Sequence, residues 1–171
     1  MPIISFSIMW TIIIDVVAWV FFHLLVSVFC FLVPLRYFQR SSSLFKIAAW
    51  ENSGHLWQRL FCVKKWKGAV PDGARLFKFG YEKKALHGVD NNTLQRFAAE
   101  TKRAELAHWL SILPAPLFFF WNPVWAGWVM ILYALFFNIP LIIVQRYNRA
   151  RLEMILDRLR MFETKNRSSK V

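Results

Sequence analysis

Positive charge is missing from two long stretches of this 171-residue chain. None of its 22 lysines and arginines lies before Arg36 or between Trp109 and Val144, although they outnumber the 10 acidic residues. A basic, aromatic-rich chain could bind nucleic acid. Here, however, the hydrophobic residues, which are 57% of the chain, and the cations occupy separate segments. That separation indicates a membrane protein, and we expect no nucleic-acid partner.

Cysteine is scarce too, and a basic N-terminal region is absent. Cys30 lies in an apolar segment and Cys62 in a basic loop, so the sequence predicts neither a disulfide framework nor a zinc site. We expect no metal and no cofactor. The N-terminal apolar run lacks a small-residue cleavage site and is too long for a cleaved signal peptide. We therefore interpret it as a membrane span.

Three hydrophobic segments predict an all-α, multi-pass membrane protein with an N-terminal span and a C-terminal helical hairpin. The expected spans are about residues 5–35, 104–121 and 124–144. Asn122-Pro123 separates the last two and is typical of a tight turn. We expect residues 1–171 to form a single membrane domain.

The distribution of cations predicts how the chain is oriented. The positive-inside rule places segments rich in lysine and arginine in the cytoplasm. We therefore expect the N-terminus outside, and a basic loop (36–103) and the tail (145–171) in the cytoplasm. The tail has apolar residues on one side and arginines on the other, which predicts a basic amphipathic helix leaving the membrane.

A helix is predicted to lead into the second span. Asn92 is a candidate N-cap, and Gln95 is spaced as its capping-box partner. Apolar residues continue from Leu94 at helical spacing. We therefore expect the helix to run without a break into Trp109 and on toward Pro114.

The stretch ETKRAELAHW, residues 100–109, carries charge into the edge of the membrane. In the predicted hairpin His108 lies level with Asn138, roughly 22 Å from the turn at about 1.5 Å per residue. Ionisable groups inside a membrane usually face a bundle interior or a functional cavity. His108 is a candidate general base, with Glu105 one turn away to orient it. Asn138 or Gln145 would donate a hydrogen bond to an oxyanion.

The candidate site extends over both helices and the basic loop. The catalytic group comprises His108, Glu105, Glu100 and Asn138. The expected substrate-binding residues are Arg103, Gln145, Arg146, Tyr147, Asn148, Arg149, Arg151, Lys64, Lys65, Trp66 and Lys67. The cations among them would attract an anionic carrier such as the phosphates of acyl-CoA. Glu100 and Arg103 are also spaced to form an ion pair at i,i+3. No convincing nucleophile is present, which favours direct transfer over a covalent intermediate.

Several alternatives stay open at this point. Asp15 and His23 of the first span either face the same cavity or pair with polar groups elsewhere in the bundle. Residues 57–68 of the loop either anchor it at the membrane interface or bind an anionic ligand. The polar cluster could be a structural network in a non-catalytic lipid-binding subunit. It could also activate water in a glutamate-dependent intramembrane protease, although the last span holds no second carboxylate–histidine block. His55 and His87 are expected to be ordinary surface histidines.

Two blocks of the sequence closely resemble the signature blocks of the glycosyl-4,4'-diaponeurosporenoate acyltransferase family: ETKRAELAHWLSILP and NIPLIIVQRYNRARL. The block FCVKKWKGAVPDGARL is similar to the tryptophan- and lysine-rich loop of that family. The resemblance covers about residues 44–160. The polar motif of the family maps onto Glu100, Arg103, Glu105, His108, Asn138, Gln145, Arg146, Tyr147, Asn148 and Arg149.

The resemblance implies a bacterial cell-membrane enzyme in the last step of staphyloxanthin-type carotenoid biosynthesis. Such an O-acyltransferase moves a fatty acyl chain onto a sugar hydroxyl of a glycosylated carotenoid, at the cytoplasmic face. A related glycolipid could replace the carotenoid, because the motif specifies chemistry rather than the acceptor. The expected partners are therefore membrane lipids, the acceptor, and an acyl donor such as acyl-CoA, which acts as a co-substrate.

Overall fold

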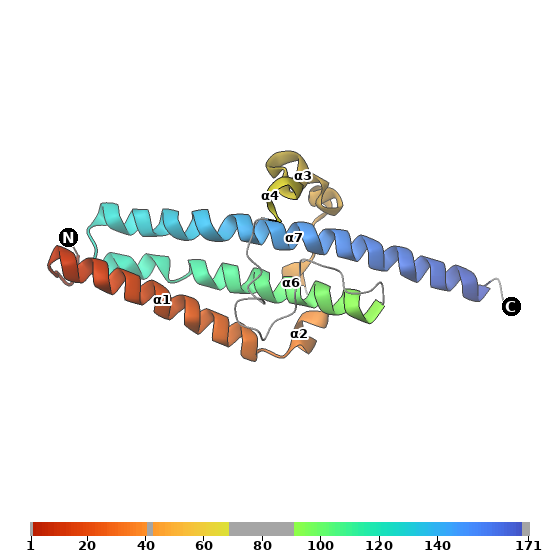
Figure 1. Cartoon of the computed structure of the whole chain (residues 1–171), viewed down its shortest axis with the longest axis horizontal. Helices are drawn as coiled ribbons and strands as arrows, with labels where there is room; N and C mark the ends of the chain where they lie inside the picture. Colours follow the sequence, from red (N-terminus) through yellow and green to blue (C-terminus); the bar gives the residue numbers. More distant parts are fainter. Residues whose placement is uncertain (1, 41–42, 69–90, 169–171) are drawn as a thin grey trace. The chain divides into compact units, whose positions relative to one another are not determined.

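The computed structural model describes residues 2–40, 43–68 and 91–168, and every regular element in these ranges is a helix (Figure 1). This confirms the all-α class. Part of the predicted basic loop, including residues 69–76 of the tryptophan- and lysine-rich block and His87, lies outside the described residues. The chain divides into two compact units. Unit 1 comprises residues 1–33 and 104–142, and unit 2 comprises residues 34–103 and 143–171.

Unit 1 gathers the three hydrophobic segments. Helix α1 (Ile8–Leu32) lies beside the end of α6 (Asn91–Ile112), the 3-10 helix η3 (Ala115–Phe120) and the first part of α7 (Val124–Ser168) (Figure 1). The core of this unit is Trp19, Ala115, Phe118 and Ala134.

Two helices in the described part of the chain are long and apolar enough to cross a membrane. These are α1 and the Val124–Met161 portion of α7. At about 1.5 Å per residue, 25 residues of α1 cover roughly 37 Å, more than the roughly 30 Å of a hydrocarbon core. Only 17% of its most apolar window is buried inside the protein, which fits a helix that faces lipid better than a soluble core helix.

The second hydrophobic segment is not one continuous α-helix. Helix α6 runs past Trp109 to Ile112, as predicted, and then gives way to η3 after Pro114. Proline lacks an N–H and disfavours helical geometry in the residue before it. The backbone tightens here, because the Leu113 N–H donates to the Leu110 carbonyl at 3.3 Å, three residues back. Residues 104–121 are therefore an α-helix end followed by a 3-10 helix.

Helix α7 joins the third hydrophobic segment and the basic tail in a single run of 45 residues, with Pro140 inside it. The predicted turn at residues 122–123 precedes it. Asp15 of α1 holds that turn, because Trp121 Nε1 and Asn122 Nδ2 both donate to its Oδ1 at 2.7 Å. Of the two alternatives for Asp15, pairing with polar groups elsewhere in the bundle is therefore the one observed. His23 stacks on Trp19, with ring centroids 5.5 Å apart.

Unit 2 contains the short helices of the loop, the start of α6 and the second half of α7. The loop helices are α2 (Leu35–Gln39), η1 (Ser43–Phe45), η2 (Ala49–Gly54), α3 (His55–Phe61) and α4 (Val63–Trp66). One core joins Leu94, Phe97 and Ala98 of α6 to Leu152 and Leu156 of α7. A second core joins Val63 to Ile143, Val144 and Tyr147. The amphipathic tail predicted from the sequence thus buries its apolar face within this unit.

Candidate functional site

The polar centre of unit 1 is a hydrogen bond between two helices. His108 Nδ1 of α6 lies 3.1 Å from Asn138 Oδ1 of α7. The Asn138 amide is buried, and its Nδ2 donates to the Ala134 carbonyl at 2.9 Å. That second bond requires the amide nitrogen to face Ala134, so the oxygen faces the imidazole. His108 Nδ1–H then donates to Asn138 Oδ1, and this bond orients the imidazole ring.

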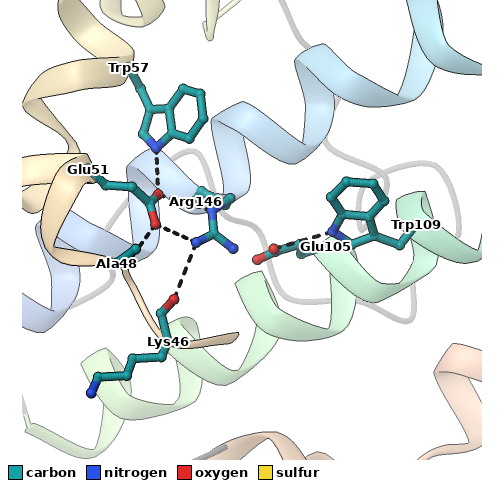
Figure 2. A network of polar contacts seen from close by, with 7 residues as sticks. All are labelled: Lys46, Ala48, Glu51, Trp57, Glu105, Trp109 and Arg146. Atoms are coloured by element: carbon teal, nitrogen blue, oxygen red, sulfur yellow. Dashed lines mark hydrogen bonds and ion pairs between the residues drawn. The ribbon is translucent and has the colours of Figure 1, made fainter. Parts of the chain in front are cut away.

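The prediction that His108 and Asn138 lie at equal depth on facing helices is confirmed by this contact. Asn138 therefore helps to orient the imidazole. The buried Glu105 accepts a long hydrogen bond, 3.5 Å, from Trp109 Nε1 (Figure 2).

The polar centre of unit 2 is Glu51, a residue that the sequence analysis did not single out. Glu51 of η2 is 0% exposed, and its carboxylate accepts hydrogen bonds from Trp57 Nε1 at 2.7 Å and from the Ala48 N–H at 2.8 Å (Figure 2). Arg146 of α7 adds two more, from Nε at 3.0 Å and from Nη2. Arg146 Nη2 also donates to the Lys46 carbonyl at 3.3 Å. The result is a side-on, bidentate ion pair, the strongest arrangement available to arginine and a carboxylate.

The chain reverses immediately after Glu51 through three left-handed residues. Asn52 has φ 45°, Ser53 has φ 51° and Gly54 has φ 85°. Gly54 packs so closely on α7 that an added Cβ would lie 3.3 Å from the Ala150 Cβ. Left-handed backbone is costly for residues other than glycine and persists where the surroundings hold it. Here the Glu51–Arg146 ion pair before the turn and the packing of Gly54 on α7 after it hold the left-handed backbone.

The surroundings of Glu51 decide its charge. Burial alone would raise its pKa, but the hydrogen bonds from Arg146, Ala48 and Trp57 and the charge of Arg146 outweigh that effect. The pKa of Glu51 therefore lies below its ordinary value, and the group is a carboxylate at neutral pH. Arg146, predicted as a substrate-binding cation, thus has its charge balanced within the protein.

The other predicted residues of unit 2 fall into two groups. Glu100 and Arg103 form the expected i,i+3 ion pair, at 2.6 Å. Arg149 and Tyr147 are buried, with the Arg149 guanidinium 5.9 Å from the centroid of the Phe45 ring. Gln145 Oε1 is a buried acceptor without a hydrogen-bond partner among the described residues.

The second group is basic and more accessible. Lys67 Nζ donates to Asn148 Oδ1 at 3.2 Å and lies 5.2 Å from the centroid of the Tyr147 ring. Lys64 and Lys65 are exposed. Burial, followed by the charges of Lys64 and Arg151, lowers the pKa of Lys67. Trp66 Nε1 donates to the Phe61 carbonyl at 2.7 Å, so this indole stabilises the loop itself.

The family model for glycosyl-4,4'-diaponeurosporenoate acyltransferase matches residues 34–158. The chain belongs to the glycosyl-4,4'-diaponeurosporenoate acyltransferase family. Relatives with that name occur in Staphylococcus aureus strains bovine RF122 / ET3-1, USA300 and NCTC 8325. Each is 40% identical over 124 residues, which is 72% of this chain and 74% of the relative. No solved structure matches the chain.

Membership of this acyltransferase family makes the protein an acyl-transferring enzyme, as the resemblance implied. The matched residues begin after α1 and include both polar centres, the His108–Asn138 contact and the Glu51–Arg146 pair. The one signal that could have revealed Glu51 is its isolation. It is the first carboxylate after Asp15, in a part of the chain dominated by cations.

Proposed function

We propose that this protein transfers a fatty acyl chain onto a hydroxyl of a glycosylated carotenoid, or of a related glycolipid, with His108 as the general base. The observation that carries this proposal is the His108–Asn138 contact, which orients the imidazole between two helices. A general base needs a fixed ring orientation and an unprotonated nitrogen. The name of the Staphylococcus aureus relatives supports the class of acceptor.

The reaction needs one proton carrier. His108 Nε2 removes the proton of the acceptor hydroxyl while the hydroxyl oxygen forms a bond to the carbonyl carbon of an acyl thioester. The carbon–sulfur bond then breaks, and the acyl chain remains on the acceptor oxygen as an ester. The imidazolium of His108 then gives this proton to the leaving sulfur, and the carrier departs as a free thiol. Direct transfer of this kind requires no covalent enzyme intermediate.

Two further residues of unit 1 support that step. The second N–H of the Asn138 amide is a donor for the oxyanion of the tetrahedral intermediate. Glu105 is buried one helical turn before His108 on α6. Its negative charge lowers the cost of a transient imidazolium in a site of low dielectric constant.

We propose that the chain crosses a bacterial cell membrane three times, with its N-terminus outside and its basic segments in the cytoplasm. The exposed apolar residues of α1 and the first part of α7 support a lipid-facing location. The acyl donor, such as acyl-CoA, approaches from the cytoplasm, where the cations attract its anionic carrier.

Lipid mass spectrometry tests this function. Purified protein in lipid is supplied with acyl-CoA and a glycosylated carotenoid, and the expected product is a carotenoid whose mass has increased by one acyl chain. Cleavage of a membrane peptide without ester formation would favour the protease alternative. Binding of lipid with neither product would favour the non-catalytic subunit.

A further inference from the structure

The cations of unit 2 differ in whether the protein balances their charge. Arg146 is paired with Glu51, Arg103 with Glu100, and Arg160 with Asp157. Lys64, Lys67 and Arg151 contact no carboxylate within the described part of the chain. Unbalanced cations that gather in one place are costly unless an anion joins them.

These three side chains gather at one turn of α7. Lys67 comes from the end of the short loop helices, and its ammonium group is held by Asn148 and the Tyr147 ring. Arg151 lies one helical turn after Tyr147, on the same face of α7. Lys64 of α4 lies one helical turn before Lys67, and the charges of Lys64 and Arg151 add to burial in lowering the pKa of Lys67.

We propose that Lys64, Lys67 and Arg151, with the Asn148 amide, form a phosphate-binding site for the carrier of the acyl donor, and that Arg146 is not part of it. This inference rests on the proposed function, because it assigns the donor side of that reaction. Lysine binds phosphate as a compact point charge, and arginine binds it through two parallel N–H groups. Asn148 accepts from Lys67 through its oxygen, which leaves its Nδ2 to donate to a phosphate oxygen. The diphosphate of coenzyme A has the charge and the acceptors that this set requires.

Isothermal titration of coenzyme A tests the site without turnover. The full-length protein is placed in nanodiscs of uncharged phosphatidylcholine, and its Kd is compared with those of Lys67→Gln and Arg151→Gln. Each variant loses one charge-assisted contact, so we expect each to raise the Kd about tenfold. Arg160→Gln is the matched control, because Arg160 is exposed and already paired with Asp157; its Kd is expected to change less than about twofold. Lys67→Arg keeps the charge and is expected to bind more tightly than Lys67→Gln.

Membrane headgroups offer the same phosphate chemistry, and a second arm separates them from a soluble carrier. In nanodiscs that contain anionic phosphatidylglycerol, the protein should still bind coenzyme A, and the Kd values of the variants should keep the same order. If anionic lipid abolishes that binding, or if Lys67→Gln and Arg151→Gln bind like the wild type in neutral discs, the inference is overturned. The proposed function is tested separately. It fails if the protein binds coenzyme A through Lys67 but forms no ester product.

Discussion

Replacement of Glu51 by glutamine removes one negative charge from a fully buried position and keeps the shape of the side chain. Four donated hydrogen bonds converge on the carboxylate, two of them from Arg146. Glutamine has only one acceptor oxygen, so its NH2 group must face at least one of these donors. Loss of one partner of a buried ion pair costs about 3–5 kcal/mol. The Arg146 side chain is 16% exposed and can reach some water, so we expect the low end, about 3 kcal/mol.

Denaturant unfolding of the purified protein in detergent measures this loss. The matched control is Asp157→Asn, which breaks an ion pair at 3.7 Å between side chains that are 62% and 68% exposed. Exposed pairs contribute about 0–1 kcal/mol, so this control should unfold nearly like the wild type. A Glu51→Gln protein as stable as Asp157→Asn would refute the reasoning that the buried pair stabilises unit 2.

The pH dependence follows from the sign of the pKa shift. The pKa of Glu51 in the folded protein is lowered from its ordinary value of 4.5, so the folded state binds the proton more weakly than the unfolded state. Its contribution to stability is therefore complete above the unfolded pKa and is lost as the pH falls through the folded pKa. The difference in unfolding free energy between wild type and Glu51→Gln should be constant near neutral pH and shrink in acid below about pH 4.5. A difference that grows on acidification would contradict this assignment.

Three further substitutions test other parts of the structure. Gly54→Ala should lower the unfolding free energy by about 1–2 kcal/mol, because φ is +85° and the new Cβ would lie 3.3 Å from Ala150; unchanged stability would argue against the left-handed turn. Gly127→Ala should cost about 1–3 kcal/mol in thermal or denaturant unfolding, because its Cβ would meet the Phe119 ring at 2.5 Å; a neutral result would argue against close packing of the hairpin. Arg151→Gln should raise the apparent KM for acyl-CoA at low ionic strength, and this effect should shrink as added salt screens the charge. An unchanged KM with a reduced yield of protein would mark Arg151 as a topology determinant.

Hydropathy and turn chemistry account for the parts of the fold that the sequence predicted correctly. The apolar runs and Asn122-Pro123 are local signals, and equal spacing from that turn was enough to bring His108 and Asn138 together. Helix ends were harder to predict. Pro114 follows the end of α6, whereas Pro140 lies inside α7, so a proline alone does not show where a helix ends.

The polar partners could be predicted only in part. A spacing of three residues places Glu105 one helical turn before His108 but does not give the direction of either side chain. Glu51 was missed because it lies in an irregular segment without periodicity and meets Arg146 across 95 residues. A contact at that separation is determined by tertiary packing, which leaves no local pattern around either residue.

The most direct test of the proposed chemistry compares His108→Ala with His55→Ala in the ester-forming assay. His55 is an exposed residue of α3 and controls for loss of an imidazole elsewhere. General-base catalysis contributes about 10²- to 10⁴-fold, so His108→Ala should lose at least about a hundredfold in kcat, whereas His55→Ala should keep it. Unfolding of both variants is measured alongside, and His108→Ala should retain most of its stability. A folded His108→Ala protein that forms ester at a near-normal rate would contradict the role of His108 as the general base.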